Sequence, residues 1–201
     1  MKQDYNKAKQ KLLTPDFKSV QQFFVENNYI LELAYSKIFE EELEDAKSLL
    51  NSINDIDTRA KWTLTMISLI EGKAVNYPTY FQLRNFFEID LNLLITHYKG
   101  EYVENILRYS DSLFNVNTEI YKYIGRVLYI NGLKEQGIFF LERAKNYFYN
   151  DPELHFCFAT INYENKNFDE AMKNIETCLA ILPEYFPAIN LYKIITDENS
   201  H

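Results

Sequence analysis

The sequence contains little glycine, proline or cysteine. Five Gly and five Pro among 201 residues are few for a protein rich in strands and tight turns, and they favour a helical fold. The only two cysteines, Cys157 and Cys178, form neither a disulfide framework nor a metal-binding motif, and they fit a reducing compartment. No apolar run approaches the length of about 18 residues that spans a membrane, and no signal peptide is recognisable. These absences predict a cytoplasmic protein without a membrane partner.

Positive charge is also scarce. The chain has 21 Lys and Arg against 29 Asp and Glu, which gives a formal net charge of −8. Proteins that bind nucleic acid neutralise its phosphates with clustered Lys and Arg. A nucleic-acid partner is therefore not expected.

The residue patterns of common catalytic sites are missing as well. The sequence has no Gly-rich phosphate loop, no Gly-x-Ser-x-Gly turn and no pair of histidines one helical turn apart around a glutamate. His155 and Cys157 are two residues apart, so on a helix they point to different faces and cannot act together as base and nucleophile. We therefore expect no enzymatic activity, no metal and no cofactor.

Hydrophobic and aromatic residues are abundant. They make up 47% and 16% of the chain, which is enough for a substantial core and is unlike a disordered sequence. Many recur at spacings of three and four residues, as in Tyr102, Ile106, Tyr109 and Leu113. This spacing predicts amphipathic helices whose aromatic rings pack in a core rather than form a cofactor pocket.

An internal repeat organises the second half of the chain. Residues 118–151 and 152–185 align without a gap at a period of 34, with Tyr129 matching Tyr163. Each stretch contains two amphipathic helical segments joined by a short polar turn. Residues 86–117 match less well, with a spacing of 32. The pattern predicts a series of helical hairpins.

Small residues occupy matching positions in the two best repeats. Gly125 aligns with Ala159, and Gly137 aligns with Ala171. Because a glycine inside a helix costs about 0.5–1 kcal/mol relative to alanine, its presence at Gly137 requires a reason. We predict that these positions allow the two helices of each hairpin to approach closely.

The repeat resembles the tetratricopeptide repeat family. The segment NFDEAMKNIETCLAILP, residues 167–183, is similar to the second helix of that family, with Ala171 and Cys178 at its small positions and Pro183 at its end. His155 and Phe158 depart from the family, in which Trp and Leu are usual. The resemblance implies an all-α fold, specifically a right-handed α-solenoid of antiparallel helical hairpins.

We expect one helical-repeat domain over residues 1–201, with a loop at residues 75–78. Lys193 replaces a buried small residue of the repeat, which predicts a polar end cap. The expected parts are N-terminal helices at 1–26, degenerate hairpins at 27–117, two well-matched repeats at 118–185 and a C-terminal cap helix at 186–201.

The resemblance also implies a binding surface. In tetratricopeptide proteins the first helix of each hairpin lines a concave groove that takes an extended peptide or a helix of a partner. The register of the repeats assigns ten residues to this groove: Phe87, Asp90, Leu94, Lys122, Arg126, Tyr129, Phe156, Thr160, Tyr163 and Asn190.

Lys122 and Arg126 lie one helical turn apart in an otherwise acidic chain. Two interpretations remain open. In the first, these cations hold a carboxylate or an acidic peptide in the groove. In the second, they pair with Glu119, Glu153 and Asp90 of the chain itself.

The sequence as a whole predicts a protein–protein interaction module, an adaptor or a chaperone-like protein, with a peptide or protein partner that it does not identify. Two alternatives belong to other classes. One is a self-assembling structural protein, with a homodimer as the simplest case. The other is a receptor for a small ligand or peptide.

Overall fold

The computed structural model describes residues 2–73 and 80–198. Within these ranges it consists of thirteen α-helices and one short 3-10 helix, without a β-strand. The prediction of an all-α protein is therefore confirmed. The loop predicted at residues 75–78 lies outside the described residues.

The helices follow one another with short connections. The N-terminal half contains α1 (Lys2–Leu12), η1 (Phe17–Val20), α2 (Gln21–Glu26), α3 (Ile30–Phe39), α4 (Leu43–Asn51), α5 (Thr58–Ile70) and α6 (Tyr80–Thr96). The C-terminal half contains α7 (Gly100–Leu107), α8 (Ser110–Phe114), α9 (Ile120–Ile130), α10 (Lys134–Lys145), α11 (Pro152–Glu164), α12 (Phe168–Ile181) and α13 (Phe186–Glu198).

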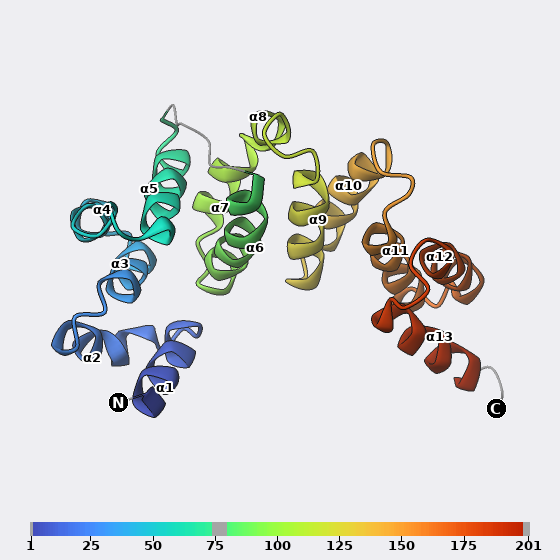
Figure 1. Cartoon of the computed structure of the whole chain (residues 1–201), viewed down its shortest axis with the longest axis horizontal. Coiled ribbons are helices and arrows are strands. Elements are labelled where there is room, and N and C mark those ends of the chain that lie inside the picture. The colour runs from blue at the N-terminus through green and yellow to red at the C-terminus, as the bar shows by residue number, and fades with distance from the viewer. Residues whose placement is uncertain (1, 74–79, 199–201) are drawn as a thin grey trace.

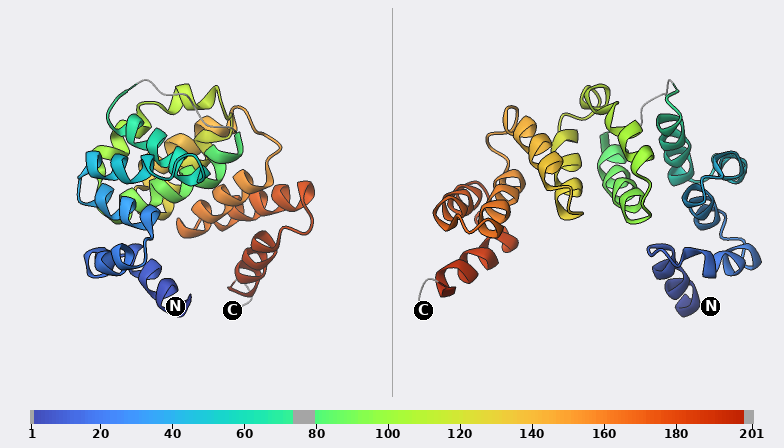
Figure 2. Two further views of the ribbon diagram at one scale, coloured as in Figure 1. Left: turned by 60° about the vertical axis from the view of Figure 1, so that its left-hand side comes forward. Right: turned by 180° about the vertical axis from the view of Figure 1, so that it is seen from behind.

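The helices form an arch, with the two chain ends at its opposite feet (Figure 1). Neighbours in the chain are also neighbours in space: α3 packs against α4, α9 against α10 and α11 against α12. In Figure 1, and from behind in Figure 2, α9, α11 and α13 follow the inner side of the arch, while α10 and α12 lie on its outer side.

Four hairpin turns share one geometry. The second residue after α3, α6, α9 and α11 is left-handed, with φ of 68° at Glu41, 58° at Tyr98, 85° at Gly132 and 61° at Lys166. In each turn the following N–H donates to the carbonyl five residues earlier, as from Leu133 to Leu128 at 3.0 Å. This is the Schellman arrangement, which satisfies the last carbonyls of a helix.

These turns also locate the irregularity of the repeat. Tyr98, Gly132 and Lys166 follow one another at 34 residues, so the period already holds at the turn between α6 and α7. The starts of α7, α10 and α12, at Gly100, Lys134 and Phe168, are also 34 residues apart, so the spacing of 32 expected for residues 86–117 is wrong. The irregular feature after the first of these turns is the division of the helical segment into α7 and α8.

The helices α9 and α10 meet at their glycines. A Cβ atom on Gly125 would lie 2.8 Å from the carbonyl oxygen of Gly137, and one on Gly137 would lie 2.7 Å from the backbone nitrogen of Tyr129. In the next hairpin, Ala159 and Ala171 are fully buried. The close approach predicted from the small residues is therefore confirmed.

The last helix has a mixed outer surface rather than the polar one predicted for a cap. Ala188, Leu191 and Ile195 are buried against the preceding hairpin. Lys193 is exposed as expected, but Phe186 is 68% exposed as well. Apolar side chains thus remain accessible at this end of the arch.

A buried histidine joins the N-terminal helix to the arch. His97, which follows α6, stacks on Phe39 with ring centroids 3.7 Å apart, and its Nε2 lies 3.0 Å from the carbonyl oxygen of Leu12 at the end of α1. Because a carbonyl only accepts, Nε2 carries the proton, and the buried Nδ1 has no hydrogen-bond partner. Burial lowers the pKa of His97, the positive charge of Lys99 acts in the same direction, and the bond to Leu12 opposes them.

We predict that Gly137→Ala lowers the free energy of unfolding by about 1–3 kcal/mol, since the new methyl group meets backbone atoms that cannot move aside. Gly100→Ala is the control, because a Cβ there meets nothing within 4 Å. Urea unfolding of both variants measures the difference. Equal stability of the two variants would contradict the close packing of α9 and α10.

We predict that His97 makes the fold sensitive to acid. Its folded pKa is lowered, so below pH of about 6.5, the ordinary value of histidine, the unfolded chain binds the proton more readily and stability falls. His97→Phe keeps an aromatic ring but does not titrate. Between pH 8 and pH 5 the melting temperature of the wild type should fall more steeply than that of the variant. An equal fall in both melting temperatures would refute this assignment.

Candidate functional site

Two of the predicted groove residues in α6 belong to the core. Phe87 is 2% exposed and packs edge-to-face against Trp62, and Leu94 is 1% exposed. Helix α6 contacts α5, α7 and α9, which leaves these side chains no surface for a partner. The assignment of Phe87 and Leu94 to the groove is therefore wrong.

Asp90 is also buried, in a polar cluster between α3, α5 and α6. Its carboxylate accepts hydrogen bonds from Arg59, from the indole of Trp62 and, at 2.8 Å, from the hydroxyl of Tyr35. Burial raises the pKa of Asp90 to about 6, although the charge of Arg59 and these hydrogen bonds act to lower it. Asp90 thus connects three helices, and its assignment to the groove is wrong.

Lys122 is a buried cation that the chain itself neutralises. Only 4% of its side chain is exposed, and its Nζ lies 2.5 Å from Asp151, 3.1 Å from Glu153 and 3.5 Å from Glu119. Burial acts to lower the pKa of Lys122, but the hydrogen bond to Asp151 and the three carboxylates raise it above its ordinary value. Of the two interpretations left open by the sequence, internal pairing holds for Lys122, with Asp151 in the place expected for Asp90.

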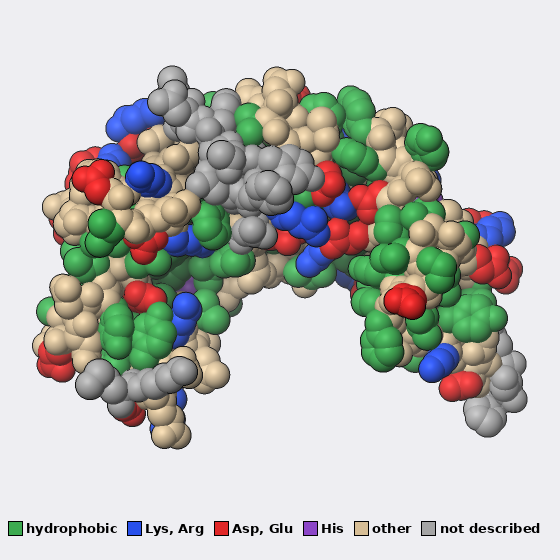
Figure 3. Space-filling model, viewed as in Figure 1, with side chains coloured by type: hydrophobic (Ala, Val, Ile, Leu, Met, Phe, Trp, Pro, Cys, Tyr) green, Lys and Arg blue, Asp and Glu red, His purple; other side chains and the backbone are tan. Residues whose placement is uncertain are grey.

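Arg126 is more accessible, with 40% of its side chain exposed. It donates to Glu153 and lies 3.9 Å from Glu88, while Arg84 lies 3.7 Å from Glu153. This ionic network connects α6, α9 and α11. Figure 3 shows charged side chains of both signs gathered near the middle of the arch, at its inner edge.

A pocket of about 310 Å³ opens between α9 and α11, beside Arg126. Four of the residues predicted for the groove line it: Arg126, Tyr129, Phe156 and Thr160. The other lining residues are Ile130, Leu141, Glu153, Cys157, Ile161 and Tyr185. The structure thus brings together the part of the predicted groove that lies between two successive hairpins.

The remaining two predicted residues lie outside the pocket. Tyr163 is half-buried one turn further along α11, with its ring 5.9 Å from that of Phe168. Asn190 is exposed on α13. Neither contributes to the pocket wall.

Asp151 positions the pocket wall formed by α11. Its side chain caps this helix by accepting a hydrogen bond from the N–H of Leu154 at 3.0 Å, and Pro152 occupies the first turn, where its missing N–H is harmless. The same carboxylate bonds to Lys122 of α9. The start of α11 is therefore fixed relative to α9.

Aromatic contacts complete the pocket. The ring of Phe156 lies edge-on to that of Tyr185, with centroids 5.4 Å apart. On the opposite wall, the Tyr129 hydroxyl donates to Glu164 at 2.8 Å, which fixes the ring. Tyr185 was not among the predicted residues. It stands 34 residues after Asp151, so at this position of the repeat an aromatic side chain takes the place of the helix-capping aspartate.

The chemistry of the wall does not suit a nucleophile. Burial and the carboxylate of Glu153 raise the pKa of the Cys157 thiol to about 12, while Arg126 and Lys122 act in the opposite direction. Because the thiolate is the reactive form, the protonated Cys157 is an unreactive wall residue. Within residues 2–73 and 80–198, no group of three or more His, Cys, Asp or Glu side chains is placed to hold a metal.

Comparisons of the chain with family models, with protein sequences and with solved structures found no match. Among the helices that the structure describes, none is both long enough and apolar enough to cross a membrane. The geometry of the pocket is therefore the basis for a proposed function.

We predict that Lys122→Ala lowers the free energy of unfolding by about 3–5 kcal/mol, because three carboxylates lose their shared buried cation. Lys173→Ala is the control, since Lys173 is exposed and its ion pair with Glu170 lies on the surface. Chemical unfolding of both variants provides the measurement. A loss no greater for Lys122→Ala than for Lys173→Ala would show that the network does not stabilise the fold.

Proposed function

We propose that the chain is a tetratricopeptide-like protein, a right-handed solenoid of antiparallel helical hairpins, that binds a short segment of another protein between α9 and α11. The shared turn geometry at Glu41, Tyr98, Gly132 and Lys166 supports the repeat. So does the position of α9, α11 and α13 along the inner side of the arch. The two free thiols support a reducing compartment such as the cytoplasm.

The observation that carries this proposal is the pocket itself. Its volume of about 310 Å³ lies at the lower end of the range for ligand sites, and suits one bulky side chain better than a large cofactor. Aromatic and aliphatic residues form most of its wall, and the Arg126–Glu153 pair lies at one side. Pockets of this composition accept the anchoring residues of protein interfaces.

Binding is supported over catalysis by the state of the polar residues. Arg126 and Glu153 pair with each other, and Tyr129 is bonded to Glu164. Cys157 is held in its protonated form by burial, which raises its pKa. These groups restrain the wall of the pocket, and a bound side chain is offered a preformed surface.

Filling the pocket tests the proposal. We predict that Thr160→Trp abolishes binding of peptides selected by the wild-type protein from a displayed library of short random sequences, because the indole occupies the space of the anchor. Thr177→Trp is the matched control. Both threonines donate to the carbonyl four residues earlier, but Thr177 lies exposed on α12, outside the pocket wall.

Circular dichroism and thermal unfolding of both variants establish that each is folded. Peptides lost by Thr160→Trp and kept by Thr177→Trp would support the pocket as the binding site. Peptides kept equally by both variants would place binding elsewhere. Recovery of no peptide by the wild type, together with a melting temperature raised by a small compound, would favour a small-ligand receptor instead.

A further inference from the structure

The ionic network beside the pocket carries no excess of positive charge. The ionic network contains three cations, Arg84, Lys122 and Arg126, and four carboxylates, those of Glu88, Glu119, Asp151 and Glu153. Burial raises the pKa of Glu88, but even with Glu88 protonated the network has no positive excess. Each of these cations already has a carboxylate partner, so the pocket offers no unpaired cation to an acidic segment.

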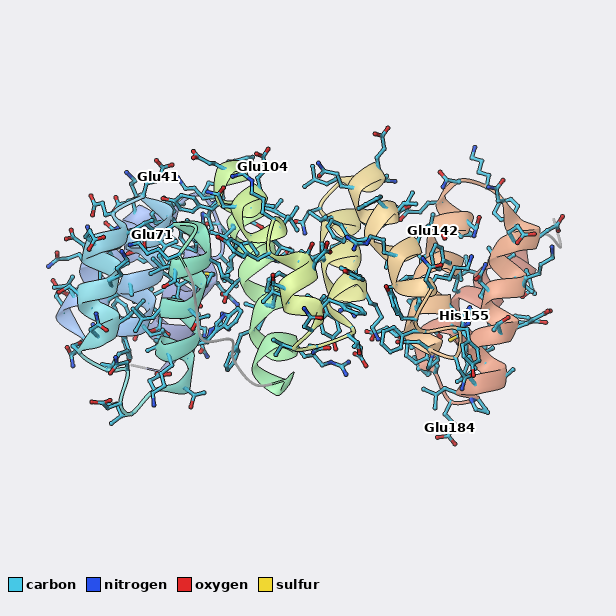
Figure 4. The ribbon with its side chains drawn as sticks, turned by 90° about the horizontal axis from the view of Figure 1, so that it is seen from above. Glu41, Glu71, Glu104, Glu142, His155 and Glu184 are labelled. Carbon is cyan, nitrogen blue, oxygen red and sulfur yellow. The ribbon has the colours of Figure 1, made fainter. Side chains whose placement is uncertain are left out.

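A further carboxylate belongs to the residue that precedes the pocket residue Tyr185. Glu184 precedes Tyr185 in the turn before α13 and is exposed. Figure 4 shows Glu184 projecting from this turn, away from the helices. No ion pair involves Glu184 in the part of the chain that the structure describes. The carboxylate of Glu184 is therefore exposed and available to a positive group of a partner that contacts the neighbouring Tyr185.

Among the charged groups near the pocket wall, Glu153 has the largest influence. Besides burial, the charge of Glu153 is the largest influence on the pKa values of Cys157 and Tyr185, and it raises both. Arg126 acts to lower both pKa values by less, and Lys122 also acts to lower that of Cys157. The apolar part of the site continues to Ile130, which is 68% exposed at the edge of the pocket. The site therefore combines an apolar hollow with a paired carboxylate, that of Glu153, and with the exposed Glu184 next to Tyr185 in the sequence.

We propose that the pocket binds a bulky apolar side chain of a partner segment that carries Lys or Arg beside this anchor. The inference rests on the proposed function and names the chemistry of its ligand. The apolar anchor is removed from water among Phe156, Ile161 and Tyr185, which supplies most of the affinity. The basic neighbour meets the exposed Glu184 and an ionic network whose cations are all paired with carboxylates, which favours this partner over an acidic one.

Two sets of synthetic peptides test this inference. Both have a central Leu, Phe or Trp in an Ala/Ser background; one set carries Lys on either side of the anchor and the other carries Glu. Fluorescence anisotropy with the full chain measures their affinities at low and at physiological salt. We expect the Lys set to bind about fivefold more tightly or better at low salt, with a smaller difference as salt screens the charges.

Charge reversal at the rim separates a local effect from net charge. Glu184→Lys should reduce the preference for the Lys set. Glu176→Lys changes the net charge by the same amount, but Glu176 lies exposed on α12, so this variant should keep the preference. Neither Glu184 nor Glu176 is buried, so both variants are expected to fold.

Equal or tighter binding of the Glu set would overturn the inference, as would an equal effect of the two charge reversals. Binding of neither set would overturn it as well. None of these outcomes decides the proposed function, which has its own test. It stands if a peptide recovered by display loses its binding in Thr160→Trp and keeps it in Thr177→Trp, and it fails if no such peptide exists.

Discussion

The contact between α9 and α10 at Gly125 and Gly137 is the constraint on which the C-terminal half of the arch depends. A methyl group on either glycine would lie within 2.8 Å of backbone atoms of the other helix, so only glycine permits this approach. The contact fixes the inner helix α9 against its outer partner. From that position Lys122 reaches Asp151, which also caps α11, and the pocket is the space left between the two inner helices.

Two buried ionic clusters hold successive helices together. Asp90 joins α3, α5 and α6 through Tyr35, Arg59 and Trp62, and Lys122 joins α9 to the start of α11. Burying a charge is expensive unless it is paired and hydrogen-bonded, and Asp90 and Lys122 both meet this condition. These charges therefore stabilise the fold and are not available to a ligand. The apolar wall and the outlying Glu184 determine what the pocket can bind.

The sequence predicted the all-helical fold and the close approach at Gly137, because both follow from local patterns of residue size and spacing. It also predicted that Arg126, Tyr129, Phe156 and Thr160 share one surface. It failed in α6, since a repeat register assumes an open inner face, whereas helices from the irregular N-terminal part cover the face that bears Asp90. It missed Tyr185, because the position is a helix cap in the preceding repeat and becomes a pocket wall only through the placement of α13.

The most direct test of this account is photo-crosslinking from the pocket. A photoreactive phenylalanine analogue at position 160, compared with the same analogue at position 177, would be irradiated in cells that produce the protein, and the crosslinked residues identified by mass spectrometry. The account predicts crosslinks from position 160 to one short segment of a partner, with an apolar residue beside Lys or Arg, and none to that segment from position 177. Identical crosslinks from both positions, or none from position 160, would contradict it.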